Sequence, residues 1–282
     1  MKIMLANVGV SEKDGFFITN MMGPNWKKNF NKVRRPDTEI VLRVSEWGIL
    51  GMDGFFHPAI DTLNSQLVLQ ACRTAEADGF DAILITCFGD PMLDQVRAFV
   101  NIPVMSIGEA ALHYATMMGK KFGIVHVSEK NIHECVKTVH EYGFGEYLAG
   151  VVATTESAEE QAEALLDAHG AIKAFQACGR KLIDMGAEVL IPACGLMTSA
   201  LRAAPKCEDE YPNGLTEVDG VPVLDVLSVG LKFAEMAVDL KKAGSPWVSR
   251  KGFYSLPTEA MLQSGHMALE DGRQTFWDYA LT

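Results

Sequence analysis

The chain has 282 residues, of which 48% are hydrophobic and 22% are charged, a composition typical of a folded protein large enough for two lobes. Its formal net charge of −11 argues against nucleic acid or an anionic membrane as a partner, because such surfaces are bound mainly through Lys and Arg. Residues 1–7 lack the apolar core of a signal peptide, and no apolar run approaches the ~18 residues of a membrane span, so we expect a cytoplasmic protein.

Short apolar runs alternate with amphipathic stretches along the chain. Such β-branched runs are typical of strands buried on both faces of a parallel sheet, and the alternation indicates βαβ units and an α/β fold. Strands are expected at residues 3–6, 40–44, 82–86, 104–107, 122–126, 147–152, 189–192 and 223–224. Helices are expected at residues 63–78, 108–118, 158–185 and 227–242.

Two parts of the chain repeat the same order of features. Residues 70–89 read QACRTAEADGFDAILITCFG and residues 176–195 read QACGRKLIDMGAEVLIPACG, so that a glycine, an acidic residue, an apolar strand and a cysteine recur in order. Two further matches keep the same order along the chain: 102–105 with 221–224, and 2–5 with 121–124. The repeat predicts a duplicated lobe, and chance similarity between α/β units is the alternative.

The duplication predicts two pseudo-symmetric lobes, each a mainly parallel sheet flanked by helices, with an active site in the cleft between them. We place lobe 1 at residues 1–118, joined by 228–282, and lobe 2 at 119–227. Ligands of open α/β sheets bind at the carboxyl ends of the strands, where Cys87 and Cys194 both fall. We therefore expect these two thiols to approach one ligand from opposite sides.

The other cysteines fit a plainer interpretation. A lone cysteine is usually a small buried hydrophobe, which is what we expect of Cys72 and Cys178 on the core faces of helices. Cys135 is expected on a surface helix and Cys207 in a polar loop, neither with a function. His133 and His140 are seven residues apart, a poor spacing for two ligands on a helix, so no metal site is expected there.

Two opposed thiols suit proton transfer at carbon. A thiolate can remove a proton next to a carbonyl, and a thiol on the other face can return one, which inverts the centre. Gly89 and Gly195 allow backbone N–H groups to approach a ligand. Asp90 is either a ligand contact or a helix cap, and the Thr86, Ser128 and Thr198 hydroxyls are either ligand contacts or cap and turn residues.

The stretch from Thr86 to Pro91 resembles the first cysteine motif of the hydantoin and allantoin racemases, in the aspartate/glutamate/hydantoin racemase superfamily. The similarity covers roughly residues 75–257 and the first strand. It implies a two-lobed pseudo-symmetric fold, no cofactor, and Cys87 and Cys194 as the acid–base pair. The residues expected to contact the substrate are Asn7, Phe88, Gly89, Asp90, Ser128, Gly195 and Leu196.

Departures from the family pattern indicate a changed substrate pocket. Asn7 is followed by Val-Gly where the family usually has Pro-Asn, and Met92 replaces a common glycine. The segment 14–57 is rich in aromatic residues, and we expect part of it to form a lid that sets substrate choice. The alternative is that these aromatic residues anchor a long surface segment or form a subunit contact. The segment 209–219 reads as an insertion.

The function expected is a cofactor-independent racemase or epimerase acting on a carbon acid beside a carbonyl, such as a hydantoin-like cyclic amide or an amino-acid derivative. One alternative is a decarboxylase, cis–trans isomerase, lyase or hydrolase on the same fold, with a cysteine as nucleophile or proton donor. Another is a small-molecule binding protein without catalysis. The expected partners are a small-molecule substrate and further copies of the chain.

Overall fold

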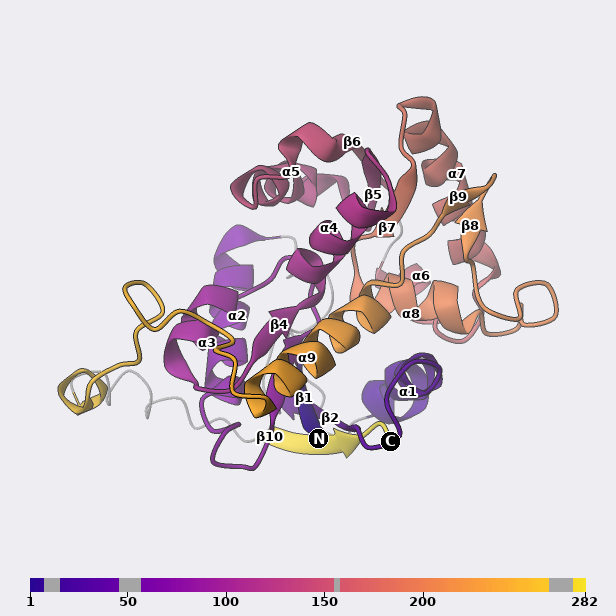
Figure 1. Cartoon of the computed structure of the whole chain (residues 1–282). Helices are drawn as coiled ribbons and strands as arrows, with labels where there is room; N and C mark the ends of the chain where they lie inside the picture. The colour runs from indigo at the N-terminus through magenta and orange to yellow at the C-terminus, as the bar shows by residue number, and fades with distance from the viewer. Residues whose placement is uncertain (8–15, 46–56, 155–157, 264–275) are drawn as a thin grey trace.

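Two sheets of mainly parallel strands form the framework of the molecule in a computed structural model that describes residues 1–7, 16–45, 57–154, 158–263 and 276–282 (Figure 1). The larger sheet has the order β10 (Phe276–Ala280), β2 (Glu39–Ser45), β1 (Lys2–Ala6), β3 (Ala82–Ile85) and β4 (Val104–Ser106). Only β10 runs antiparallel to its neighbour in that sheet. The smaller sheet has the order β6 (Leu148–Ala153), β5 (Phe122–His126) and β7 (Val189–Pro192), all parallel.

The two sheets have the same topology. In the larger sheet β2, β1, β3 and β4 lie side by side, and in the smaller one β6, β5 and β7 follow the same order. Val223 then forms a parallel bridge to Leu190 of β7, in the place that β4 holds beside β3. The duplicated, two-lobed α/β fold predicted from the repeat is therefore confirmed. The strands expected up to residue 192 agree with β1 to β7 to within one or two residues, whereas the strand expected at 223–224 is only an isolated bridge at Val223.

Helices and helical turns connect the strands. They are η1 (Ile18–Met22), α1 (Gly23–Asn31), α2 (Pro58–Cys72), α3 (Leu93–Phe99), α4 (Ile107–Met118), η3 (Glu129–Asn131), α5 (Ile132–Glu141), η4 (Gly145–Tyr147), α6 (Ala158–Glu163), α7 (His169–Asp184), α8 (Gly195–Ala203) and α9 (Val226–Lys242). A short antiparallel pair, β8 (Glu217–Val218) and β9 (Val221–Pro222), precedes α9.

Two helix predictions were wrong in extent. The helix expected at 158–185 is two helices, because the Ala168 N–H donates to the carbonyl of Pro205 and the Asp167 carboxylate accepts the N–H of His169. These bonds take the chain out of the helical path before α7 begins. The helix expected at 63–78 instead starts at Pro58, whose fixed φ suits a first helical turn, and ends at Cys72.

The core joins the lobes because strand side chains alternate between two covered faces. Ile3 and Leu5 pack in the central cluster with residues of α1, α4 and α9, whereas Met4 and Ala6 pack against α2 and α3. The central cluster also holds Ile124 and its neighbours from the smaller sheet, so the lobes share one core. α7 packs on the other face of the smaller sheet.

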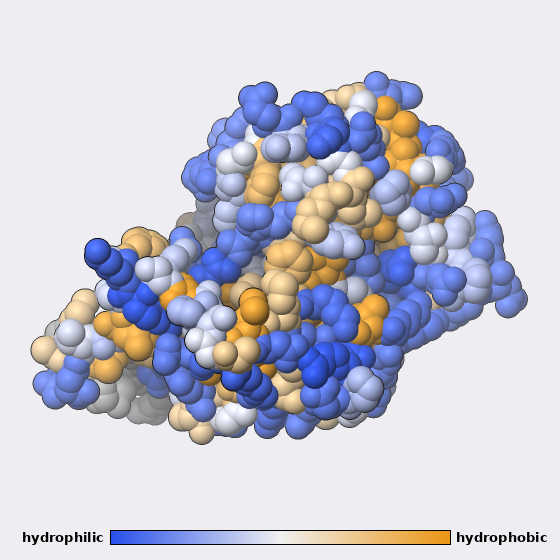
Figure 2. All heavy atoms as spheres, viewed as in Figure 1, coloured by the Kyte–Doolittle hydropathy of each residue, from blue (hydrophilic) through white to orange (hydrophobic). Residues whose placement is uncertain are grey.

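The face shown in Figure 2 is mixed, with apolar side chains over α4 and in several further patches among the hydrophilic ones. The exposed apolar residues of that helix are Tyr114, Met117 and Met118. None of the helices within the described residues is both long and apolar enough to cross a membrane.

Candidate active site

Four strand ends, two from each lobe, meet at one cavity of about 180 Å³. β1 leads to Asn7 and β3 to Cys87 in lobe 1, and β5 leads to Val127 and β7 to Cys194 in lobe 2. Of the residues expected from the sequence to form the site, the lining includes Asn7, Cys87, Phe88, Gly89, Cys194, Gly195 and Leu196. The fold thus brings both cysteines into one cleft.

Cys87 lies in a turn two residues after β3. Burial raises the pKa of its thiol to about 12, although the Gly89 N–H bonds to the sulfur and lowers it; the nearby charges of Cys194, Asp61 and Asp90 raise it further. The residue keeps some exposure to the cleft, yet protein surrounds the sulfur itself. Cys87 is therefore a neutral thiol near pH 7 in this ligand-free form.

Cys194 occupies the N-cap of α8. Its backbone is extended and its carbonyl accepts both the N–H of Thr198, at 2.9 Å, and the Thr198 hydroxyl, at 2.8 Å. Thr198 is completely buried, so its hydroxyl fixes the cysteine loop and does not contact the cavity. The Cys194 side chain makes no capping hydrogen bond to α8, so the helix acts on it only through its dipole, which favours negative charge at a helix N-terminus.

Gly195 lets the two cysteine loops approach each other. A Cβ atom at this position would lie 2.8 Å from the carbonyl oxygen of Thr86 and 3.5 Å from the ring of Trp26. Any larger residue would force the start of α8 away from the strand that carries Cys87. The charge of Cys194 raises the pKa of Cys87, so the two sulfurs are within electrostatic reach.

The apolar wall of the cavity comes from the aromatic-rich segment that follows β1. Phe17, Met22 and Trp26 line it, together with Phe88 and Leu196 from the cysteine loops. Trp26 is almost fully buried, so it is a fixed part of the wall. Of the other aromatics of the proposed lid, Phe16 is exposed and is not in the lining of the cavity, and Trp47, Phe55 and Phe56 lie outside the described residues.

Asp90 binds protein groups and lines neither of the two cavities described here. Its carboxylate accepts the hydroxyl of Ser106, the N–H groups of Gly108 (3.0 Å) and Glu109 (2.7 Å), and the hydroxyl of Tyr142 (2.7 Å). It thus caps α4 and ties the Cys87 loop to lobe 2. Burial raises the pKa of Asp90 to about 6, although the bonds from Ser106, Tyr142 and Glu109 lower it.

Ser128 is likewise absent from the lining of both cavities. Its hydroxyl accepts the N–H of Lys130 at the start of η3, and its own N–H donates to Nδ1 of His126 at 3.1 Å. Burial lowers the pKa of His126, so the imidazole is neutral near pH 7. Nδ1 also lies 3.1 Å from the carbonyl oxygen of Ser128, so the Ser128 backbone offers this ring nitrogen both a donor and an acceptor.

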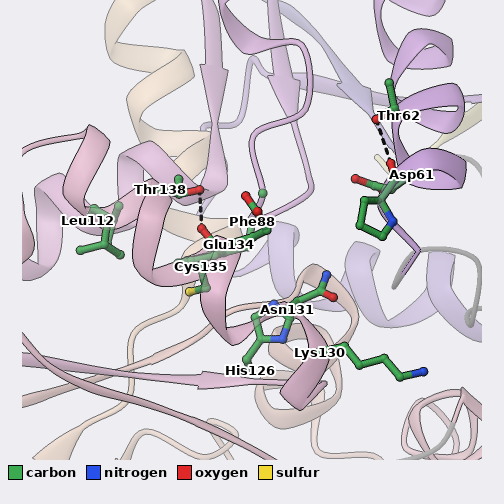
Figure 3. Close-up of a pocket in the computed structure, with 13 residues that line it drawn as sticks. Asp61, Thr62, Phe88, Leu112, His126, Lys130, Asn131, Glu134, Cys135 and Thr138 are labelled. Atoms are coloured by element: carbon green, nitrogen blue, oxygen red, sulfur yellow. Dashed lines mark hydrogen bonds between the residues drawn. The ribbon is translucent and has the colours of Figure 1, made fainter.

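A second cavity, of about 440 Å³, adjoins the first between α2 and α5 (Figure 3). The polar residues that line this cavity were not predicted from the sequence. The residues that it shares with the catalytic cavity are Asp61, Phe88, Gly89, His126 and Asn131. The end of β5 is equivalent to the end of β1, so the repeat offered a signal for His126; no sequence pattern pointed to Asp61.

One expectation for the remaining cysteines was wrong. Cys135 is buried in the wall of the second cavity and not on a surface. Cys207 lies in the loop after α8, as expected, and its side chain is buried there. Cys72 and Cys178 are buried in helices of the core, as predicted.

One group among the described residues has donors suited to a metal ion. The ligand atoms of Asp167, His169 and Cys207 lie within 4.8 Å of one another. They come from the start of α7 and the loop after α8, line neither cavity, and the Asp167 carboxylate also pairs with Lys206. This group therefore takes no part in the cysteine cleft.

Comparison with known proteins agrees with this geometry. Residues 31–234 match the model of the Asp/Glu/Hydantoin racemase family. The chain belongs to that family. It is 26% identical to a hydantoin racemase of Pseudomonas sp. (strain NS671), over 75% of this chain and 78% of that protein, and 28% identical to one of Paenarthrobacter aurescens, over 74% and 80%.

A solved structure of allantoin racemase from Klebsiella pneumoniae superimposes with a TM-score of 0.70 at 26% identity, over 92% of this chain and 94% of that one. The family and these relatives identify the chain as an isomerase of the racemase type.

Proposed function

We propose that this racemase inverts a carbon acid beside a carbonyl, such as C5 of a 5-substituted hydantoin, and that Cys87 and Cys194 move the proton without a cofactor. The observation that carries the proposal is the placement of the two thiols. They lie at equivalent strand ends of duplicated lobes and line one cavity. The printed names of the relatives suggest a cyclic ureide as the substrate class.

The electrostatics of the pair support unequal proton states. A charge on Cys194 raises the pKa of Cys87, so ionisation of one sulfur opposes ionisation of the other. The helix terminus favours the thiolate on Cys194, and burial keeps Cys87 protonated. The resting site then holds one base and one acid, which is what a one-step inversion needs.

In the forward direction the Cys194 thiolate takes the proton from one face of the carbon, and the C–H electron pair moves into the carbonyl to give an enolate. The Cys87 thiol donates its proton to the opposite face, which restores the carbonyl and leaves a Cys87 thiolate. The opposite enantiomer uses the same steps with the cysteines exchanged. The imidazole of His126 and the first N–H groups of α8 line the cavity, and they are the donors that we propose for the enolate oxygen.

The test follows the optical rotation of single enantiomers of several 5-substituted hydantoins with protein dialysed against a chelator. We expect the rotation to decay to zero at constant substrate mass, and added divalent metals to leave the rate unchanged. A product of altered mass would show that the reaction is decarboxylation or hydrolysis and not racemisation. Activity restored only by a particular metal would overturn the cofactor-independent mechanism.

A further inference from the structure

The second cavity lies directly beside the catalytic one. The two have Asp61, Phe88, Gly89, His126 and Asn131 in common, so these residues form the border between them. The volumes differ: about 180 Å³ around the cysteines and about 440 Å³ in the second cavity. The catalytic cavity matches a small ring held between the two sulfurs. A sizeable substituent on the reacting carbon must therefore extend past Phe88 and Gly89 into the second cavity.

The walls of the two cavities differ in polarity. Around the cysteines the wall is largely apolar, with Phe17, Met22 and Trp26. The second cavity has apolar residues such as Leu112 and Val139 in its wall, but polar and charged groups from both lobes also line it (Figure 3). These groups are Asp61, Thr62, His126, Lys130, Asn131, Glu134 and Thr138. A substituent that enters this space meets hydrogen-bonding groups on both sides, which favours a polar over a hydrocarbon chain.

Asp61 is the acidic group nearest to the chemistry among the residues of that wall. It lies in the first turn of α2 in lobe 1, where it lines both cavities, and its charge raises the pKa of Cys87. Within the described residues, no hydrogen bond or ion pair engages its carboxylate. It is half-buried, and burial raises its pKa. A half-buried carboxylate without a partner is an acceptor that an N–H donor of a ligand can satisfy.

No other charged group of the cavity satisfies the Asp61 carboxylate in place of a ligand donor. Lys130 is exposed at the rim and forms no ion pair with Asp61 within 4.0 Å, and Glu134, also exposed, pairs with Lys137 outside. His126 is neutral because burial lowers its pKa. Asp61 therefore decides the charge that a ligand meets at the junction of the two cavities.

We propose that the second cavity is the subsite for the substituent on the reacting carbon, and that Asp61 selects a substituent ending in a cationic N–H donor, such as an ammonium or guanidinium group, over one ending in a carboxylate. This inference rests on the proposed racemase function. Asp61 acts in substrate choice and not in proton transfer, because the two cysteines already supply the acid and the base.

The first experiment measures kcat/KM for hydantoins of similar length, 5-(4-aminobutyl)hydantoin and 5-(3-carboxypropyl)hydantoin. We expect the wild type to prefer the cationic compound by at least about tenfold, and Asp61→Asn to reduce that preference by about tenfold. Glu141→Gln is the matched control, because it removes the same charge from an exposed position of α5 outside the cavity. It should keep the wild-type preference. An unchanged preference in Asp61→Asn overturns the inference.

The second experiment does not depend on racemisation. It uses the Cys194→Ser background, so that no faster thiol in the cavity is modified first. It compares how fast Cys87 reacts with the cationic reagent aminoethyl methanethiosulfonate and the anionic reagent sulfonatoethyl methanethiosulfonate, measured by peptide mass and normalised to a small free thiol. The Cys194→Ser protein should favour the cation by at least about tenfold, and adding Asp61→Asn should reduce this ratio about fivefold.

The two experiments separate the inference from the function on which it rests. If no hydantoin is racemised but the reagent ratio falls in Asp61→Asn, the proposed function fails and the charge selection by Asp61 stands. If hydantoins are racemised and neither ratio changes, the function stands and the inference is overturned.

Discussion

The two cysteine loops occupy equivalent places in duplicated lobes, yet they are built differently. After Cys194 the chain enters α8 at once, with Gly195 as its first residue. After Cys87 it makes a turn in which Asp90 and Met92 both have positive φ, 49° and 59°, before α3 begins at Leu93. One sulfur therefore sits at a helix terminus, whereas the other is held in a buried turn that Asp90 clamps.

This difference is the basis of the unequal proton states that we propose. Both sulfurs belong to residues two positions beyond the end of a strand, β3 or β7, so the local backbone is what distinguishes them. Burial in the turn raises the pKa of Cys87, whereas Cys194 is the N-cap residue of α8, where the helix dipole favours negative charge. In the proposed mechanism, an acid and a base thus come from two copies of one residue.

The largest effect is expected from removing either sulfur. Cys87→Ser and Cys194→Ser should each reduce kcat for racemisation by about a thousandfold or more, because a serine hydroxyl is too weak an acid and its alkoxide too poorly populated. Cys178→Ser, in the core of lobe 2, is the control and should keep most of the activity. Activity near wild type in either catalytic variant would end the two-thiol account.

The unequal proton states are tested by alkylation with iodoacetamide at pH 8. We expect Cys194 to react about a hundredfold faster than Cys87, because a thiol with a pKa of about 12 is almost entirely protonated there. The rate at Cys87 should still rise above pH 9. Peptide mass spectrometry gives both rates, and preferential labelling of Cys87 would reverse the assignment of base and acid.

Loosening the clamp on the Cys87 loop should have a smaller effect. Four donors bond to the Asp90 carboxylate, and Asp90→Asn replaces one of its acceptor oxygens by an NH₂ group that is itself a donor. Because the four donors then share fewer acceptors, kcat should fall about tenfold. Tyr142→Phe, which removes one of those donors, should cost less. A kcat equal to wild type in Asp90→Asn would show that the loop holds its place without the clamp.

The same variant has a pH signature in stability. The folded pKa of Asp90, about 6, lies above its ordinary value of 3.8, so its contribution is fully present below about pH 4 and is lost as the pH rises through 6. As the pH falls from 7 to 4, the free energy of unfolding of the wild type should therefore increase by about 3 kcal/mol relative to that of Asp90→Asn. Denaturant titrations at both pH values measure this difference, and a constant offset would contradict it.

The smallest effect is expected where the two loops touch. Gly195→Ala places a methyl group 2.8 Å from the Thr86 carbonyl oxygen, so we expect a loss of about 1–3 kcal/mol in stability and a severalfold lower kcat. Gly170→Ala on α7 is the matched control, because nothing lies within 4 Å of its added Cβ. It should be neutral or slightly stabilising. Equal behaviour of the two variants would show that the loops have room to separate.

Much of the fold was predictable, because buried parallel strands leave continuous apolar runs and a duplicated lobe leaves a repeat. The same repeat placed Cys87 and Cys194 in one cleft. Contacts set by packing were not predictable: Asp90 reaches α4 and Tyr142 of the other lobe, and Asp61 reaches the cleft from a helix with no motif around it. The break before α7 likewise depends on a bond to distant Pro205.

The central claim is that two different sulfurs act on opposite faces of one carbon. Its most direct test is racemisation of a single enantiomer of a 5-substituted hydantoin in D₂O, stopped at low conversion and corrected for exchange without enzyme. The account predicts one deuterium at C5 in the newly formed enantiomer and almost none in the remaining substrate, because the proton taken by one cysteine is not the one delivered by the other. Equal deuterium in both enantiomers would instead show a single base acting on both faces.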